Sequence, residues 1–151
     1  MAKNNVTAHS PRAIELEEDV IFVDLLRCTG CWTCALSCMT GNGLKDGEHF
    51  VSVRTLGSGE GIDRPAGTWP NLHMSWMPVY AKACIKCQDR CRVGEVPYCV
   101  KNCPNKALVY GAGVPEKMKA ARDRGARIFS LPAWEKTRSD IVYASPDREI
   151  I

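Results

Sequence analysis

Four cysteines stand close together near the start of this 151-residue chain, in the stretch Cys28-Thr-Gly-Cys31-Trp-Thr-Cys34-Ala-Leu-Ser-Cys38. Two residues separate each of the first three, and the fourth follows after three more. Three thiolates on one tight loop can bind three irons of a cubane, whereas a fourth cysteine one helical turn further on points away. The first three cysteines are therefore predicted to bind one cluster, and Cys38 to reach toward a second.

A second cysteine group complements the first. Cys84-Ile-Lys-Cys87 is followed by an eleven-residue spacer and then by Cys99-Val-Lys-Asn-Cys103-Pro104. This ending repeats the three-residue step of the first group and adds a proline, as in bacterial ferredoxins. If the last cysteine of each group crosses over, each half of the chain lends one ligand to the other half's cluster, which couples folding to cluster assembly. Two [4Fe-4S] clusters are predicted: cluster 1 on Cys28, Cys31, Cys34 and Cys103, and cluster 2 on Cys84, Cys87, Cys99 and Cys38.

The ninth cysteine, Cys91, competes with Cys99 for one of these ligand positions. It lies inside the spacer, four residues after Cys87. Cys99 is favoured because its three-residue step to Cys103 matches the step that ends the first group. Cys91 is then a spare thiol in an inserted loop. An odd cysteine is often left over in this way when the others are assigned to metal sites.

Composition limits the class of protein. The chain has 20 basic and 17 acidic residues, a net charge of +3, and no long basic run of the kind that nucleic-acid-binding arms carry. No apolar run approaches the roughly eighteen residues of a membrane-spanning helix. Residues 1–12 hold neither a twin-arginine pair nor an apolar signal core, so we expect a cytoplasmic chain, or one exported together with a signal-bearing partner. Nine cysteines in that setting indicate metal binding rather than disulfides.

The expected fold is α+β and ferredoxin-like, with two half-domains. The order strand, cysteines, helix, strand occurs twice, which indicates pseudo-two-fold symmetry. Residues 41–67 hold seven of the twelve glycines and predict a long inserted loop system around a strand. Strands are predicted at 20–26, 51–55, 76–81 and 107–110, and helices at 31–39 and 115–124.

We divide the chain into three parts. Residues 1–18 are a polar N-terminal arm, residues 19–111 form the two-cluster domain, and residues 112–151 form a C-terminal extension expected to dock on a partner. Within this extension, residues 140–143 are strand-like.

Other residues near the cysteines have more than one interpretation. Trp32 and Trp76 are expected to exclude water by packing rather than to relay electrons. The three histidines, His9, His49 and His73, show no metal-ligand spacing and receive no role. Four basic residues flank the second cysteine group: Lys82, Lys86, Arg90 and Arg92. They could raise the potential of cluster 2, meet an acidic partner or remain solvated, and these interpretations stay open.

Two further classes of function are weighed against an iron-sulfur protein. A pair of four-cysteine zinc sites would make the chain a structural module, but zinc ribbons pair C-x2-C with C-x2-C, and the third and crossing cysteines favour a cubane. An enzyme acting on its own substrate would need a nucleophile with a base, a phosphate loop or a nucleotide fingerprint. The sequence contains none of these patterns, and we predict no catalytic residue.

Between about Asp19 and Gly111 the chain resembles the iron-sulfur subunits of the molybdopterin oxidoreductases, the dimethyl sulfoxide reductase family. Val23-Asp24 leading into the first cysteine group, Cys84-Ile-Lys-Cys87, and the segment from Pro97 to Leu108 carry the likeness. In that family the proline-cysteine segment supplies the third ligand of the second group, which supports Cys99 over Cys91. The chain departs from the family in having two cluster motifs where four are common, and in its longer spacer.

The resemblance implies an electron-transfer subunit that docks on a large catalytic subunit with a molybdenum or tungsten bis-pterin cofactor. A further redox partner or a membrane anchor is compatible with it, and nucleic acid is not an expected partner. A free-standing two-cluster ferredoxin is the alternative, although such a carrier needs neither the long loop system nor the extension after Gly111. Reductase and dehydrogenase directions of electron flow are equally open, because cluster potentials span roughly −700 to +450 mV.

Overall fold

The computed structural model describes residues 20–56, 65–131 and 140–146, so the arm predicted for residues 1–18 lies outside the described residues. Strands and helices are both present, and the fold is α+β. The helices are α3 (Thr33–Asn42), α4 (Gln88–Arg92), α5 (Tyr98–Asn102) and α6 (Val114–Asp123), with a 3-10 turn at Gly111–Gly113. The strands are β1 (Ile21–Asp24), β2 (Val51–Thr55), β3 (Ala66–Thr68), β4 (Asn71–His73), β5 (Trp76–Tyr80), β6 (Leu108–Tyr110), β7 (Ile128–Phe129) and β8 (Ile141–Ala144).

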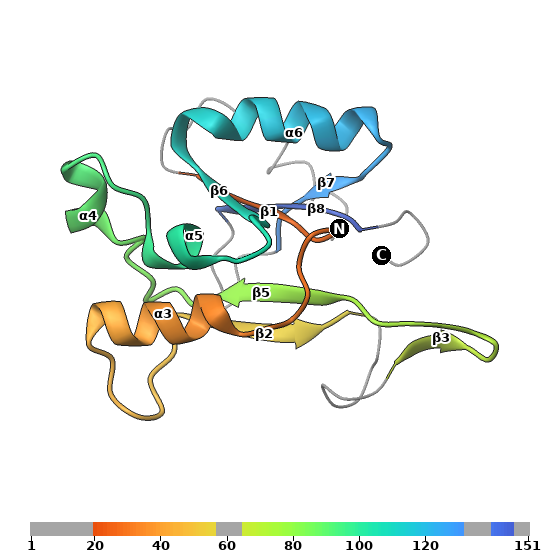
Figure 1. Cartoon of the computed structure of the whole chain (residues 1–151), viewed down its shortest axis with the longest axis horizontal. Helices are drawn as coiled ribbons and strands as arrows, with labels where there is room; N and C mark the ends of the chain where they lie inside the picture. Colours follow the sequence, from red (N-terminus) through yellow and green to blue (C-terminus); the bar gives the residue numbers. More distant parts are fainter. Residues whose placement is uncertain (1–19, 57–64, 132–139, 147–151) are drawn as a thin grey trace, which may run out of the picture.

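The largest sheet has the strand order β6-β1-β8-β7 (Figure 1). Strand β1 runs antiparallel to β6 and parallel to β8, and β7 pairs antiparallel with β8. Separate antiparallel pairs join β2 to β5 and β3 to β4. The pairs β1–β6 and β2–β5 each join a strand beside the first cysteine group to a strand beside the second. The two halves of the chain are therefore connected by two separate strand pairings.

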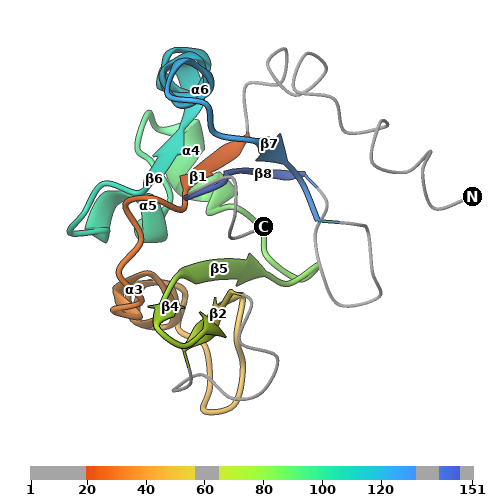
Figure 2. The same ribbon diagram turned by 90° about the vertical axis from the view of Figure 1, so that its right-hand side faces the viewer.

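Figure 2 shows three layers, with α6 above the four-stranded sheet and the β2–β5 pair with α3 below it. The alternation of side chains along β1 divides the core in the same way. Phe22 packs toward α6 with Met118 and Val142. Ile21 and Val23 belong to the second core cluster, on the side of β5 and the cysteines. Strand β1 is therefore buried on both faces and forms one wall of the cysteine-rich layer.

Most elements predicted from the sequence are confirmed. The strand at 51–55 and the helix after the first cysteine group are present. Helix α3 is followed by Gly43, whose left-handed backbone (φ 61°) is typical of a glycine that ends a helix. Helix α6 has Pro115 in its first turn and Gly125 (φ 90°) beyond its end. Residues 141–144 form a strand, and it lies next to β1 inside the central sheet, a position that the sequence did not predict.

Candidate functional site: two cysteine-lined cavities

The first cysteine loop leaves β1 and turns tightly before α3. Gly30 adopts φ 71°, and a Cβ there would stand 2.6 Å from the ring of Trp76. Glycine is thus required both by the backbone conformation and by the indole of Trp76 on β5. Trp32, also in a left-handed conformation (φ 64°), precedes the helix. The loop places Cys28 and Cys31 opposite the start of α3.

Helix α3 carries the next two cysteines. Cys34 and Cys38 lie one turn apart, about 6 Å along the axis, and both are buried. The second loop follows β5 in a similar way, with Cys84 buried and with Lys86 and Cys87 both at positive φ (52° and 51°). The two loops therefore bend the backbone into left-handed conformations beside their cysteines.

The short helix α5 carries the last two predicted ligands. Cys99 is 5% exposed, and Cys103 caps the helix at its C-terminal end. The helix packs closely on α3, because a Cβ on Gly41 would stand 2.5 Å from the ring of Tyr98. A larger residue than glycine at this contact would force the two cysteine-bearing helices apart.

The eight predicted ligands line two separate cavities in the predicted sets of four. Cavity 1 is lined by Cys28, Cys31, Cys34 and Cys103, together with Trp32, Val53, Pro78 and Leu108 among others. Cavity 2 is lined by Cys38, Cys84, Cys87 and Cys99, together with Asn42, Phe50, Tyr80 and Pro97 among others. Helix α3 therefore contributes one thiol to each cavity, and so does α5 together with its C-cap residue Cys103. The two cavities are neighbours, since Cys34 of cavity 1 and Cys38 of cavity 2 lie one turn apart on α3.

Burial controls the ionisation of most of these thiols. It raises the pKa of Cys34 to about 12 and that of Cys38 to about 11, and it also raises the pKa of Cys99. Exposed Cys31 behaves differently, because a hydrogen bond with the hydroxyl of Thr33 lowers its pKa. Metal ligation requires thiolates, so a metal group entering these cavities would have to release protons from the buried thiols.

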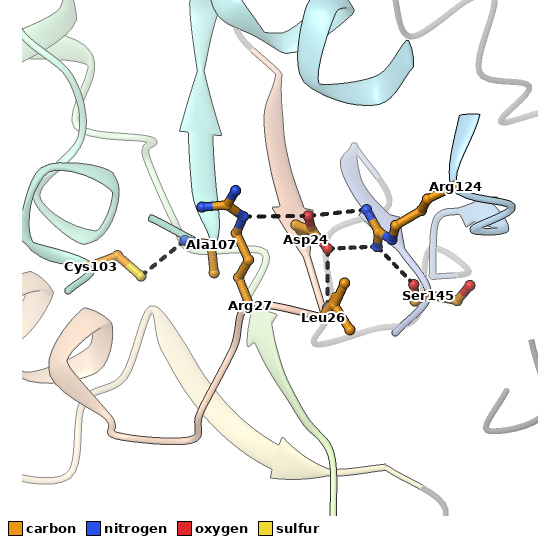
Figure 3. A network of polar contacts seen from close by, with 7 residues as sticks. All are labelled: Asp24, Leu26, Arg27, Cys103, Ala107, Arg124 and Ser145. Atoms are coloured by element: carbon orange, nitrogen blue, oxygen red, sulfur yellow. Dashed lines mark hydrogen bonds and ion pairs between the residues drawn. The ribbon is translucent and has the colours of Figure 1, made fainter. Parts of the chain in front are cut away.

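A polar network fixes the position of Cys103 at the edge of cavity 1 (Figure 3). The backbone N–H of Ala107 donates to the Sγ of Cys103 (3.4 Å), and the carbonyl of Ala107 accepts from the N–H of Asp24 (2.8 Å). The Asp24 carboxylate accepts from the guanidinium of Arg124 (2.7 and 3.2 Å) and from the N–H of Leu26 (3.1 Å). The network links β1, the end of α6 and Cys103.

Cys91 has a different environment from Cys99. Among the described residues that line cavity 2, Cys99 is present and Cys91 is absent. The Sγ of Cys91, on α4, instead donates to the carbonyl of Lys86 (3.4 Å). This placement agrees with the interpretation of Cys91 as a spare thiol.

The basic residues of the second loop divide into buried and exposed members. Lys86 is 6% exposed, and its ammonium lies 2.6 Å from the carboxylate of Asp140. Arg90 pairs with Glu95 (2.9 Å) and lies over the ring of Tyr98 at 3.9 Å from its centroid. Lys82 and Arg92 are exposed. Lys86 also lines cavity 2. Of the four basic residues, it is therefore the best placed to raise the reduction potential of a cluster bound there.

The remaining predicted features have simpler positions. Trp76 packs against the core beside Gly30, in agreement with a packing role, and Trp32 lines cavity 1 while remaining 39% exposed. His49 is exposed, His73 lies on β4, and His9 lies outside the described residues. Within residues 20–56, 65–131 and 140–146, no three side chains of histidine, cysteine, aspartate or glutamate are arranged to hold a single metal ion.

Two residues that the sequence analysis did not single out contact the cysteines of cavity 2. Asn42 lies four residues after Cys38 on the same face of α3. Since side chains at this spacing are neighbours on a helix, the contact between Asn42 and Cys38 could have been predicted from the sequence. Tyr80 contacts Cys99 from β5, and its position in a buried strand gave no signal of that contact.

The chain is similar to iron-sulfur subunits of several reductases. It is 33% identical over 93 residues to the iron-sulfur subunit assigned to a dimethyl sulfoxide reductase of Halobacterium salinarum, covering 58% of this chain and 31% of that protein. It is 33% identical over 86 residues to the iron-sulfur subunit of the arsenate respiratory reductase of a Shewanella strain, covering 57% and 29%. A third relative, hydrogenase-4 component A of Escherichia coli, is 30% identical over 127 residues, covering 78% and 61%. No family model matches the chain.

These comparisons relate the chain to iron-sulfur subunits of oxidoreductases. The relatives include subunits of dimethyl sulfoxide, arsenate and selenate reductases, which agrees with the family resemblance of the cysteine motifs. The chain spans less than a third of the length of these three relatives. In the part of the chain that the structure describes, none of the helices has the length and apolar character needed to cross a membrane.

Proposed function

We propose that this chain relays single electrons through two [4Fe-4S] clusters, as the electron-transfer subunit of a molybdopterin-type oxidoreductase. The observation that carries the proposal is the distribution of thiols over two neighbouring cavities. Helix α3 gives one cysteine to each cavity, and so does α5 with its C-cap residue Cys103, which is the crossover expected of a ferredoxin-like domain with two clusters. The similarity to iron-sulfur subunits of reductases supports the same function.

The donor set of each cavity fits an iron-sulfur cluster. Four thiols and otherwise mostly apolar walls surround each space, and cysteine thiolates are the usual ligands of [4Fe-4S] clusters. Cys28, Cys31, Cys34 and Cys103 would hold cluster 1, and Cys38, Cys84, Cys87 and Cys99 would hold cluster 2. When bound, each cluster supplies a site for one electron. The apolar side chains around it, such as Val53 and Leu108 at cavity 1, restrict the access of water.

The zinc alternative makes different demands on the same residues. A structural zinc ion would need four thiolates at about 2.3 Å from one point. A cubane instead takes each thiolate on a different iron, so its ligands surround a larger group. The third cysteine of the first group, Cys34, and the proline-flanked Cys103 of the second group favour the larger group.

The exposed edge of cavity 1 is the place where we propose that electrons enter or leave. Cys31 is exposed at this edge, and Trp32 beside it is 39% exposed. All four cysteines of cavity 2 are buried. An external partner would thus come nearer to cluster 1 through this edge, and helix α3 joins the two cavities through Cys34 and Cys38, which lie one turn apart.

The proposed partner is a large catalytic subunit with a molybdenum or tungsten bis-pterin cofactor, with a further redox partner or membrane anchor in the same complex. A catalytic subunit of a hydrogenase is the second candidate, because the match to hydrogenase-4 component A covers 78% of this chain. A free-standing ferredoxin needs no stable partner. Anaerobic affinity purification of the tagged chain from its native cells separates these possibilities through the cofactor of the co-purifying protein. A chain that is always recovered alone would exclude the subunit proposal.

The cluster content is tested by measuring iron, acid-labile sulfide and zinc in anaerobically purified protein, with an absorption spectrum. We expect about eight irons and eight sulfides per chain, as two [4Fe-4S] clusters require. Zinc without sulfide would show instead that the chain is a structural module.

A further inference from the structure

The sulfur atoms of cavity 2 receive hydrogen bonds from buried or partly buried groups. The hydroxyl of Tyr80 donates to the Sγ of Cys99 at 3.4 Å, and Tyr80 is 1% exposed. Because the environment is apolar and excludes water, this hydrogen bond is stronger than an exposed one. Tyr80 belongs to β5, whose pairing with β2 fixes its position.

Asn42 serves two other sulfurs of the same cavity. Its side-chain amide lies 3.5 Å from the Sγ of Cys38 and 3.7 Å from the Sγ of Cys87. The same amide nitrogen donates to the carbonyl of Cys38 at 3.0 Å, which holds the side chain in place at the end of α3. Asn42 therefore lies between a ligand of the first cysteine group and a ligand of the second.

The fourth sulfur of cavity 2 has a main-chain donor. The N–H of Lys86 lies 3.4 Å from the Sγ of Cys84. At cavity 1, by contrast, the side chains of Thr33 and Thr29 contact Cys31 at the exposed edge, and Cys103 is served by the main chain of Ala107. Side-chain donors that can be removed by mutation without exposing the site are thus found at cavity 2.

We propose that Tyr80 and Asn42 are positioning residues that raise the reduction potential of cluster 2. The inference rests on the proposed function, because it concerns the cluster that Cys38, Cys84, Cys87 and Cys99 would hold. On reduction a cluster gains one electron from an external reductant, and no bond forms or breaks. The added negative charge is shared with the ligand sulfurs, so donors aimed at those sulfurs stabilise the reduced state more than the oxidised state.

The experiment is a redox titration of the full-length, iron-loaded chain under anaerobic conditions, with dithionite as reductant and electron paramagnetic resonance as readout. Tyr80→Phe and Asn42→Ala each remove a donor. Each is expected to reduce the ratio of reduced to oxidised cluster 2 at a fixed potential by about tenfold, which is about 59 mV for a one-electron couple. Cluster 2 is identified as the signal that disappears in Cys99→Ser. The potential of cluster 1 should remain unchanged.

Two matched controls distinguish tuning from general damage. Tyr143→Phe also removes a buried tyrosine hydroxyl, but that hydroxyl donates to the carbonyl of Pro78. Asn102→Ala removes an amide that donates to the carbonyl four residues earlier, that of Tyr98, as Asn42 does on α3. Neither control should move the potential of cluster 2.

The outcomes separate the inference from the proposed function. Two clusters whose potentials stay unchanged in both Tyr80→Phe and Asn42→Ala, or shift equally in the controls, would overturn the inference and leave the electron-relay function standing. A wild-type chain without iron and sulfide would overturn both. A drop in the potential of cluster 2 alone, in either donor variant, supports the inference, and the use of two variants covers the case in which one does not fold.

Discussion

Gly41 of α3 lies directly against the ring of Tyr98 of α5, so closely that a Cβ on the glycine would stand 2.5 Å from two ring carbons. The guanidinium of Arg90 lies over the same ring at 3.9 Å from its centroid, which limits how far the ring can move. This contact sets the distance between the two helices that share their cysteines between both cavities. The space for the clusters therefore depends on a residue that is not itself a ligand.

Gly41→Ala tests the importance of this contact. In an ordinary helix this change would stabilise by about 1 kcal/mol, but overpacking against Tyr98 is expected to cost about 1–3 kcal/mol instead. We expect a thermal midpoint lower by several degrees and a lower iron content after anaerobic purification. Thr40→Ala, at the neighbouring exposed position of the same helix, is the control and should leave both unchanged. A Gly41→Ala protein with a higher midpoint would contradict the close contact.

The ion pair between Asp24 and Arg124 gives a second prediction. Arg124 donates two hydrogen bonds to the carboxylate and a third to the carbonyl of Ser145 (3.1 Å), and the Asp24 side chain is 14% exposed. Arg124→Ala removes these hydrogen bonds and leaves the carboxylate with the more distant guanidinium of Arg27 (3.9 Å), so it is expected to destabilise by about 1.5–3 kcal/mol. Thermal or denaturant unfolding of the iron-loaded protein measures the change.

Arg92 provides the matched control for that experiment. Its guanidinium lies 3.7 Å from Asp89, and both side chains are largely exposed. Exposed pairs contribute about 0–1 kcal/mol, so Arg92→Ala should change stability little. Equal losses in Arg124→Ala and Arg92→Ala would mean that the Asp24 network has no special structural role.

Much of the site could be predicted because cysteine spacing is a local property of the chain. The three-residue steps from Cys34 to Cys38 and from Cys99 to Cys103 each place two thiols about one helical turn apart, and each pair has one member in each cavity. Their role as cluster ligands stays a prediction. The strands beside the cysteine groups were visible as short apolar runs. Local spacing and periodicity thus carried the information that mattered most for the function.

Long-range contacts could not be predicted in the same way. Residues 141–144 look like a strand, but nothing in their composition specifies that they pair in parallel with β1. The burial of Lys86 follows from this pairing, because its partner Asp140 immediately precedes β8. The contact of Tyr80 with Cys99 likewise depends on the packing of β5 against α5. Each of these features joins segments that are distant in sequence, where periodicity gives no information.

Buried Tyr143 predicts a pH dependence of stability. Its hydroxyl donates to the carbonyl of Pro78 (2.7 Å) and so links the central sheet to β5, and burial raises the pKa of Tyr143 above its usual value near 10. The folded state therefore favours the neutral phenol. This contribution is fully present below pH 10 and is lost as the pH rises above 10.

The thermal midpoint of the iron-loaded protein should accordingly decrease above pH 10, where the unfolded chain ionises this tyrosine and the folded chain does not. Tyr143→Phe is expected to cost about 1 kcal/mol at pH 7 through the lost hydrogen bond and to show a shallower decrease at alkaline pH. Tyr80 is buried as well and contributes a decrease of the same sign, so the variant should flatten the slope only in part. An unchanged slope in Tyr143→Phe would contradict a neutral, buried phenol.

The final prediction concerns the assignment of the cysteines to two clusters. Cys31→Ser and Cys103→Ser alter thiols that are distant in sequence but line the same cavity, and both should remove the same cluster. Cys38→Ser and Cys99→Ser should remove the other. Each variant is expected to lose about half of the iron and sulfide. The electron paramagnetic resonance spectrum of the reduced protein then shows which cluster remains.

Cys91→Ser is the matched control for Cys99→Ser, because both change a cysteine of the second group. The thiol of Cys91 donates to a main-chain carbonyl of the second loop and lies outside the lining of cavity 2, so its replacement should leave the full iron and sulfide content and both spectra unchanged. If Cys91→Ser lost half of the iron while Cys99→Ser kept all of it, Cys91 on α4 would replace Cys99 as a ligand of cluster 2. The hydrogen bond from Tyr80 would then serve a cysteine that binds no iron, and the tuning of cluster 2 by Tyr80 would fail with it.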